Sequence, residues 1–482
     1  MTSVVDAGST DMVGFQRLAD FAMVSPNGGS VADRRRLCER FAPRLSVNPR
    51  LNRRTVSYQG NKAVPGFRWL KYKEGFSRDL VLDLIQAHEP ESVLDPFAGT
   101  GTTPLVAASC GVRATGVEIM PVGVAAGKAV IAAAEDVPRA AFHEAANGLL
   151  AHVRRAGPTP TAFAFPHVRI TRGAFPENSE AEIAKAREFN TRVDAPAIET
   201  LLNLACMSVL EECSYTRKDG QYLRWDYRSG RSRTRMDKGE VAPFAEALEA
   251  RLFEMLEDFD ELKSMYGGKN RPELITGSSL EVLRTLPDRS FDMVITSPPY
   301  ANRYDYTRTY ALELAWLGYG QQDFIDLRQR LLTATVENKE KRDWLNSVYT
   351  DDCSELSRAS CMYQESAVHE VLSILREKSS ELSNRNIIRL IEGYFFEMAV
   401  IVAELGRVVR PGGVVLMVND NVQYHGEEVP VDFLLADYAE RSGFTCANIW
   451  MLPRGKGNSS QQMARFGRRE IRKCVYRWVR SG

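Results

Sequence analysis

The feature that most constrains the fold of this chain is a glycine-rich turn between a short strand and a helix. Residues 92–103 read Ser-Val-Leu-Asp-Pro-Phe-Ala-Gly-Thr-Gly-Thr-Thr, and the apolar run 104–108 that follows is helix-like. A second short apolar run, 114–117, ends at Glu118. Glycine lets a backbone pass close to a ligand, and an acid after the second strand of a doubly wound α/β fold is placed to hold a ribose diol. The pattern predicts a nucleotide-type site, although a tight turn in any α/β protein would also use glycine.

A second motif, Ser297-Pro-Pro-Tyr300, follows directly on the apolar strand-like run 291–295. Proline has a fixed φ and offers only a carbonyl, so the two prolines present acceptor oxygens in a stiff frame. Tyr300 adds a flat face on which a planar ring can stack. Acceptors beside a stacking face suit an exocyclic amine on an aromatic ring, as in a nucleobase. The alternative is an ordinary proline-rich turn with a buried tyrosine.

Together the two motifs resemble those of the DNA amino-methyltransferases, which transfer a methyl group from S-adenosylmethionine (AdoMet) to N4 of cytosine or N6 of adenine. The resemblance covers the segments near 68–125, 273–320 and 390–480. It implies an α/β fold, namely a Rossmann-like class I AdoMet-dependent methyltransferase sheet with large, mainly helical insertions. A serine in first position, as Ser297 is, is typical of the N4-cytosine branch. An N6-adenine enzyme and, less favoured, an RNA base amino-methyltransferase are the alternatives.

The resemblance also implies roles for single residues. The catalytic tetrad would be Ser297, Pro298, Pro299 and Tyr300, with acceptors at Ser297 and the Pro298 carbonyl holding the amine and Tyr300 stacking on the base. The residues expected around AdoMet are Asp95, Phe97, Gly99, Gly101, Thr102, Glu118 and Ser278. Ser278 stands where the family usually has an acid, which predicts a weaker bond to the adenine amino group. Because the target atom is unreachable within a duplex, base flipping is implied.

The remaining segments are arranged around these motifs. We expect a basic N-terminal arm (1–67), a cofactor-binding half of the core (68–125), an insertion that is the candidate target-recognition region (126–272), the catalytic strand and loop (273–310), a helical insertion (311–387) and the remainder of the core (388–482). The charged stretch 337–342 is expected to be solvated surface.

Several segments have a composition that suits nucleic acid. Residues 34–73 are markedly basic, either as a solvated helix face or as a strip that follows phosphates, and a polar, basic loop precedes the closing strand 474–479. Residues 215–235 alternate cationic and aromatic side chains, which suits phosphate contact and base stacking. The alternative there is a β-hairpin about Asp219-Gly220 with a solvated basic edge. The expected DNA contacts are Arg217, Lys218, Tyr222, Arg224, Trp225, Arg228 and Arg303.

The composition of the chain bears on three other features, namely its overall charge, metal binding and membrane insertion. The 62 basic and 62 acidic residues give zero formal net charge, so a DNA surface must come from local clustering. The eight cysteines have no C-x-x-C spacing, and the six histidines are dispersed, so no metal site is expected. No apolar run approaches the roughly 18 residues of a membrane span, which predicts a cytoplasmic protein.

The expected partners are double-stranded DNA and a cognate restriction endonuclease or another defence-system protein. A nucleotide-binding module without catalysis is the alternative from another class, and it would not need the tetrad.

Overall fold

The computed structural model describes residues 4–6, 24–219, 222–231, 235–267, 269–349, 354–453, 456–457, 466 and 470–482. Much of the first 23 residues, the side chain of Tyr222 and most of the basic loop before the closing strand lie outside the described residues.

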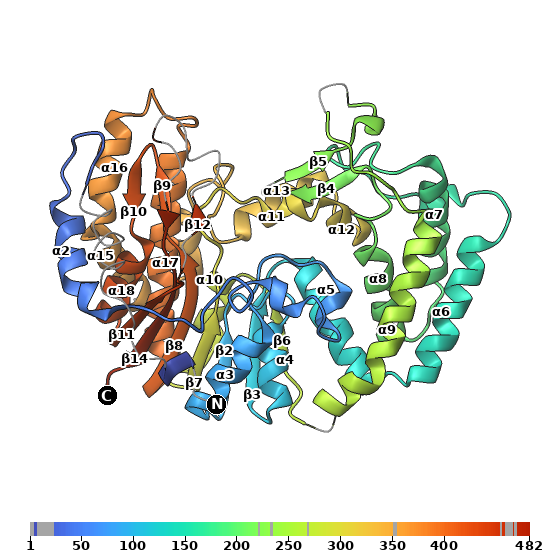
Figure 1. Cartoon of the computed structure of the whole chain (residues 1–482), viewed down its shortest axis with the longest axis horizontal. Helices are drawn as coiled ribbons and strands as arrows, with labels where there is room; N and C mark the ends of the chain where they lie inside the picture. The colour runs from blue at the N-terminus through green and yellow to red at the C-terminus, as the bar shows by residue number, and fades with distance from the viewer. Residues whose placement is uncertain are drawn as a thin grey trace.

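An eight-stranded sheet forms the centre of the molecule (Figure 1). Its strand order is β1-β11-β14-β8-β7-β2-β3-β6, and all neighbours are parallel except β14, which is antiparallel to both β11 and β8. The chain moves from β2 outward through β3 to β6 and then crosses to β7 on the other side of β2. The strand order therefore reverses between β2 and β7, where ligands bind in open α/β sheets. The strands are β1 (Leu45–Val47), β2 (Ser92–Asp95), β3 (Arg113–Glu118), β6 (Glu273–Thr276), β7 (Phe291–Thr296), β8 (Val409–Asp420), β11 (Phe444–Met451) and β14 (Lys473–Arg480).

Helices cover both faces of this sheet, because its central strands are apolar on both sides. Along β7, Met293 and Ile295 pack into one hydrophobic cluster, and Val294 between them packs into the other. The first cluster includes α3 (Arg78–His88), α4 (Thr102–Ser109) and α5 (Pro121–Ile131). The second includes α2 (Ala32–Phe41), α10 (Ser279–Val282), α15 (Ser354–Gln364), α16 (Val368–Glu377), α17 (Ile387–Val408) and α18 (Val431–Arg441).

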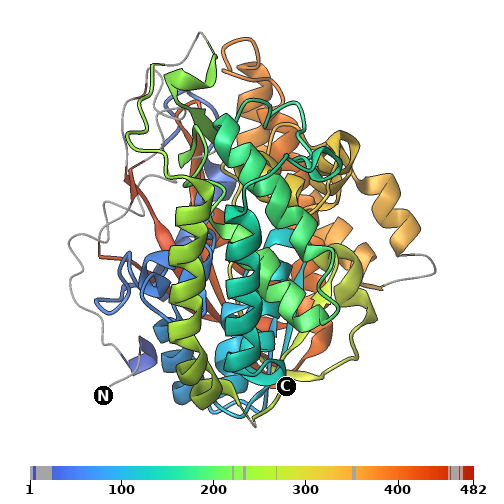
Figure 2. The ribbon, with the colours of Figure 1, turned by 90° about the vertical axis from the view of Figure 1, so that its right-hand side faces the viewer.

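The segment between β3 and β6 forms a helical lobe beside the sheet (Figure 1), and Figure 2 shows its long helices from the side. A small antiparallel hairpin, β4 (Thr216–Asp219) and β5 (Tyr222–Trp225), lies in the same insertion. The helices of the lobe are α6 (Arg139–Arg154), α7 (Glu177–Asn190), α8 (Pro196–Ser208) and α9 (Phe244–Tyr266). The elements after β7 include α11 (Tyr306–Thr309), α12 (Ala311–Trp316), α13 (Gln321–Arg330) and α14 (Arg342–Val348), and those after β8 include β9 (Val422–Tyr424), β10 (Glu427–Val429), β12 (Lys456–Gly457) and β13 (Glu470–Ile471).

Two expectations about surface charge are wrong at one charged residue each. Lys341, in the stretch expected to be solvated, is buried and lies 2.8 Å from Glu397 on α17. Arg34, at the start of the basic segment, is fully buried between Glu370 and Glu427 at 3.1 and 2.9 Å. In both places a carboxylate distant in sequence neutralises the cation, which no local pattern indicates. The basic segment also supplies β1, the edge strand beside β11.

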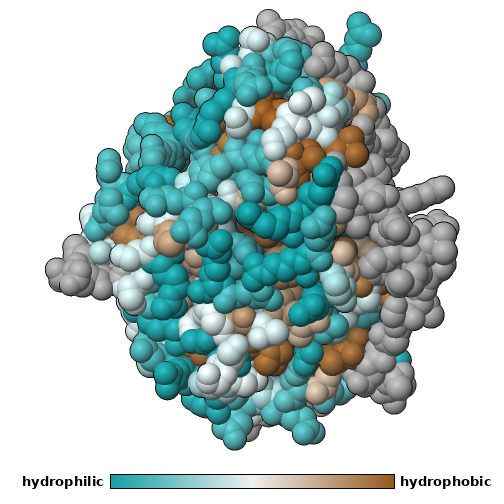
Figure 3. Space-filling view, turned by 90° about the vertical axis from the view of Figure 1, so that its left-hand side faces the viewer, coloured by the Kyte–Doolittle hydropathy of each residue, from teal (hydrophilic) through white to brown (hydrophobic). Residues whose placement is uncertain are grey.

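Hydrophilic residues cover most of the described surface on the side of α2 and α16, with hydrophobic residues in small separate patches (Figure 3). Within the described ranges, no helix is long and apolar enough to cross a membrane.

Candidate active site between the glycine turn and the tetrad

The glycine turn after β2 has the backbone that only glycine adopts easily. Gly99 and Gly101 have φ values of +57° and +86°. A Cβ on Gly99 would lie 3.2 Å from the ring of Tyr72 and 3.4 Å from the carbonyl oxygen of Glu74. The turn therefore lies in close contact with segment 72–74, and Gly101 is the N-cap of α4.

Glu118, at the end of β3, holds this turn in place. Its two carboxylate oxygens accept hydrogen bonds from the backbone N–H groups of Gly99 and Met120, each at 2.6 Å. Burial raises the pKa of Glu118 to about 7, against the lowering effect of these N–H donors. A carboxylate has about four acceptor sites, so it can still accept from a diol.

Asp95 joins the ends of the two strands at which the strand order reverses. It is 2% exposed, and its Oδ1 accepts from the Phe97 N–H at 3.0 Å and from the Thr296 hydroxyl at 2.6 Å. Burial raises its pKa to about 6. Asp95 thus fixes the glycine turn after β2 relative to the tetrad after β7, which are about 200 residues apart in the chain.

A hollow, here called the inner hollow, opens beside the turn and encloses about 530 Å³, part of it open to solvent. Of the residues expected around the cofactor, Phe97, Gly99, Glu118 and Ser278 line it. The Ser278 hydroxyl donates to the Arg330 carbonyl at 2.9 Å, so its oxygen keeps its acceptor capacity. Asp95 and Gly101 lie outside the lining and support the turn, and Thr102 lines a neighbouring hollow together with Lys62 and Lys71.

A second, larger hollow, here called the outer hollow, has a volume of about 2360 Å³, which includes space open to solvent. Ser297, Pro298 and Tyr300 line it, whereas Pro299 faces the inner hollow. Three residues line both hollows, namely Glu74, Ser297 and Tyr306. The two motifs that are remote in sequence therefore meet at one junction.

Two residues that the sequence analysis missed hold Tyr300 in the outer hollow. Lys473 Nζ lies 3.4 Å from the Tyr300 hydroxyl and 3.1 Å from Oδ1 of Asp420, and the Tyr300 hydroxyl is 3.1 Å from that of Ser297. Burial alone would lower the pKa of Lys473, but the Asp420 charge raises it above its usual value. Lys473 and Asp420 are directly opposite each other on β14 and β8. Without the strand register, sequence gives no signal for this pair.

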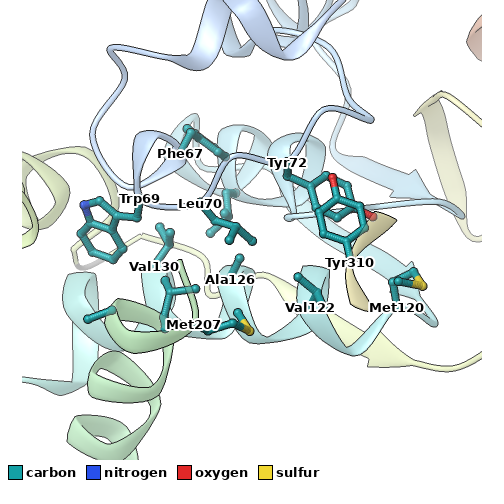
Figure 4. Packing of buried hydrophobic residues seen from close by; sticks show 14 of the residues in the cluster. Phe67, Trp69, Leu70, Tyr72, Met120, Val122, Ala126, Val130, Met207 and Tyr310 are labelled. Carbon is teal, nitrogen blue, oxygen red and sulfur yellow. The ribbon is translucent and has the colours of Figure 1, made fainter. Parts of the chain in front are cut away.

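Glu74 is the third residue that the sequence analysis did not single out. Its half-buried carboxylate accepts a hydrogen bond from the Tyr310 hydroxyl, which in turn accepts from the Lys73 N–H at 3.1 Å. Figure 4 shows Tyr72 lying against Tyr310, and the two rings are stacked with centroids 4.9 Å apart. Burial raises the pKa of Glu74, and the tyrosine hydroxyls oppose that rise. A carboxylate is thus held in an aromatic setting at the junction.

The residues expected to contact DNA divide into exposed and buried groups. Arg217 and Arg224 are exposed and directly opposite each other on β4 and β5, and Arg224 is ion-paired with Asp219 at 2.7 Å. Lys218, between them in the pattern, is buried, with its ammonium paired with Glu313 and 4.5 Å from the centroid of the Tyr310 ring. Its charge is therefore directed into the protein, contrary to the expected surface role.

The other residues of the predicted DNA-contacting group are engaged locally. Arg228 is paired with Asp226 at 2.7 Å, and the guanidinium of Arg231 covers the ring of Trp225 at 3.6 Å from its centroid. Arg303 is half-buried and donates to Ser383 at 3.4 Å. Its φ of +70° is unusual for a residue with a side chain. Arg303 follows the tetrad closely in the chain.

Comparison with known proteins shows the family of the chain. It is 39% identical over 455 residues to the type II methyltransferase M.AvaI of Nostoc sp. (strain PCC 7120), covering 91% of this chain and 92% of that protein. It is 40% identical over 458 residues to the type II methyltransferase M.BsoBI of Geobacillus stearothermophilus, covering 89% and 88%. No protein-family model matches the chain, and no solved structure matches it closely enough to be significant. The chain belongs to the type II methyltransferases.

Proposed function

We propose that this protein is a site-specific DNA methyltransferase that transfers a methyl group from AdoMet to N4 of cytosine. The observation that carries this proposal is the junction of the two hollows. Ser297 borders both the hollow beside the glycine turn and the hollow that contains Tyr300. A methyl donor on one side and an amine on the other would meet at this residue.

The residues around the inner hollow fit AdoMet. Glu118 offers a carboxylate for a ribose diol, and Leu280, Leu331 and Leu332 offer apolar surface for an adenine ring. The strand order, with one antiparallel strand between β8 and β11, supports a Rossmann-like class I methyltransferase sheet. When bound, AdoMet would supply an activated methyl group on a sulfonium.

The role of the chain in methyl transfer is to position the amine. An aromatic amine is a weak nucleophile because its lone pair is delocalised into the ring. Acceptor oxygens at Ser297 and the Pro298 carbonyl would hold the amine hydrogens and leave the lone pair directed at the methyl group, while Tyr300 stacks on the base. Correct approach geometry of this kind can supply about 7–11 kcal/mol of a barrier. Glu74, at the same junction, would place a negative charge beside the positive centre and accept the proton that the amine loses.

Ser297 in the first position of the tetrad supports cytosine N4 over adenine N6. A serine hydroxyl has one donor and two acceptor sites. The adenine branch typically has an aspartate, whose ionised carboxylate only accepts, or an asparagine, whose amide has two donors and a carbonyl acceptor. The N6-adenine enzyme has the same fold and is the second candidate.

The exposed pair Arg217 and Arg224 supports DNA as the substrate. Both guanidinium groups are exposed on one hairpin, Arg224 beside Asp219 at 2.7 Å, and the phosphates of a duplex would attract them. The target base would be flipped into the outer hollow, at a cost of a few kcal/mol. The relatives named type II methyltransferases support a restriction-modification setting with a cognate endonuclease.

The test is to express the protein in a host without DNA methylation and to sequence the DNA by a modification-sensitive method. Mass spectrometry of the digested DNA should show N4-methylcytosine in a single sequence context. N6-methyladenine in its place would favour the second candidate. Label from tritiated AdoMet that appears in tRNA but not in DNA would overturn DNA as the substrate.

A further inference from the structure

The pair Lys473 and Asp420 lies where a flipped base would have to present its ring edge. Both residues line the outer hollow together with Ser297, Pro298 and Tyr300. Their side chains are 17% and 14% exposed, so the charges are partly shielded from water but face the hollow. The sheet register fixes the pair, because Lys473 is directly opposite Asp420.

In the hydrogen bonds of this pair, Lys473 can only donate. An ammonium has three N–H donors and no acceptor, so Lys473 donates to the Tyr300 hydroxyl. The Tyr300 and Ser297 hydroxyls are 3.1 Å apart, and either can donate to the other. Tyr300 donates in the arrangement that leaves Ser297 able to accept an amine hydrogen. Ser297 keeps one acceptor site for an amine. Among the residues that the structure describes, Asp420 and Tyr300 take two of the three donors of Lys473, which leaves one for a ligand.

We propose that Lys473, held in place by Asp420, selects cytosine by donating a hydrogen bond to its ring carbonyl oxygen. This inference rests on the proposed function, because it needs a base with its amine at Ser297. Along one edge, cytosine presents an amine donor, a ring-nitrogen acceptor and a carbonyl acceptor. The corresponding edge of adenine presents an amine, a ring nitrogen and a C–H. The ammonium of Lys473 is separated from Ser297 by the Tyr300 hydroxyl. With the amine of the base at Ser297, this donor would face the carbonyl oxygen of cytosine but the C–H of adenine.

Two other roles for Lys473 would give different results. If Lys473 only holds Tyr300, its removal would slow transfer to every base by the same factor. If the pair only stabilises the contact between β8 and β14, its removal would lower stability and leave the preference unchanged. Removing Lys473 alone leaves Asp420 without its partner in a half-buried place, which is costly. A double variant that also neutralises Asp420 avoids this problem.

The experiment compares single-turnover methyl transfer to three duplexes that contain the recognition sequence found by sequencing. The target position carries cytosine, a deoxycytidine analogue without the 2-carbonyl oxygen, or adenine. The variants are Lys473→Met, Lys473→Met combined with Asp420→Asn, and Lys73→Met as a matched control. Lys73 also lines the outer hollow, but its Nζ donates to the Lys218 carbonyl at 2.5 Å.

We expect the unmodified enzyme to prefer cytosine over the carbonyl-free analogue by about tenfold or more, as expected when a buried donor loses its partner. Both Lys473 variants should treat the two substrates within about twofold, Lys73→Met should keep the preference, and the AdoMet dissociation constant should stay within about twofold throughout. An undiminished preference in the double variant would overturn the inference. Methyl groups found only on adenine, or none at all, with the unmodified enzyme would instead overturn the proposed function.

Discussion

The sheet and the β4–β5 hairpin of the lobe place their polar side chains by different means. In the sheet, the place of a side chain depends on where its strand ends. Asp95 and Thr296 end neighbouring strands, and their side chains are therefore hydrogen-bonded at 2.6 Å. In the hairpin, the place of a side chain depends on the alternation of the two strand faces. Arg217 is exposed, while Lys218, the next residue, is buried against Glu313. Polar residues at strand ends therefore indicate a site more reliably than a cluster of charge does. The following predictions test this difference.

The largest effect is expected from Lys218→Met. It leaves Glu313 buried without a cation, and breaking such a pair costs about 3–5 kcal/mol. Burial already raises the pKa of Glu313, which indicates how poorly the site tolerates the charge. The urea midpoint should fall strongly. Arg217→Met, one residue away and exposed, should change stability by no more than about 0.5 kcal/mol. Equal losses in the two variants would show that the hairpin does not separate its charges in this way.

The next effect concerns the tetrad. Tyr300→Ala and Ser297→Ala should each lower the single-turnover rate by about 100-fold or more, because both remove groups that position the amine. Calorimetry should give an AdoMet affinity within about twofold of the unmodified enzyme, since the cofactor contacts of the glycine turn remain. A large loss of AdoMet affinity in both variants would contradict the assigned roles.

AdoMet affinity should depend on pH through Glu118. Its pKa is raised to about 7 in the free protein, and a bound diol favours the ionised form. Affinity should therefore rise, by about tenfold, as pH increases from below 6 to above 7. The raised pKa acts on stability in the opposite direction, so its contribution to folding is lost as pH rises through about 7. Glu118→Gln should remove the pH dependence of AdoMet binding. Titration calorimetry at several pH values measures the AdoMet affinity of the unmodified enzyme and of the variant. If the affinity of the variant changed with pH as much as that of the unmodified enzyme, the dependence would belong to another group.

The smallest effect is expected at the exposed arginines. Arg217→Ala and Arg224→Ala should each weaken DNA binding several-fold and reduce the salt slope by about one, with no change in sequence preference. Fluorescence anisotropy over a range of salt concentrations measures this. Arg154→Ala is a suitable control, because this residue is also exposed and ion-paired but lies on the distant helix α6. A loss of the same size in the control would mean that the hairpin has no special role.

Sequence predicted those parts of the site that depend on local backbone chemistry. The strand before Gly99, helix α4 and the strand before Ser297 are all confirmed. The missed residues depend on pairings between distant segments, since Lys473 finds Asp420 only through the register of β14 with β8. Glu74 was passed over because its importance comes from Tyr310, more than 200 residues later. The burial of Arg34 and Lys341 has the same cause.

The helical lobe is inserted in the crossover between two neighbouring parallel strands. It leaves after β3 and returns at β6, and these two strands are parallel neighbours from Thr115 and Glu273 to Glu118 and Thr276. The insertion is confined to the crossover that leads to the edge strand β6, so its helices can grow, shrink or be replaced while the ends of β2 and β7, with Asp95 and Ser297, stay in the sheet. Evolution could in this way exchange the predicted target-recognition region while the site at Asp95 and Ser297 stays constant, and a laboratory graft of the whole lobe between relatives would use the same boundary.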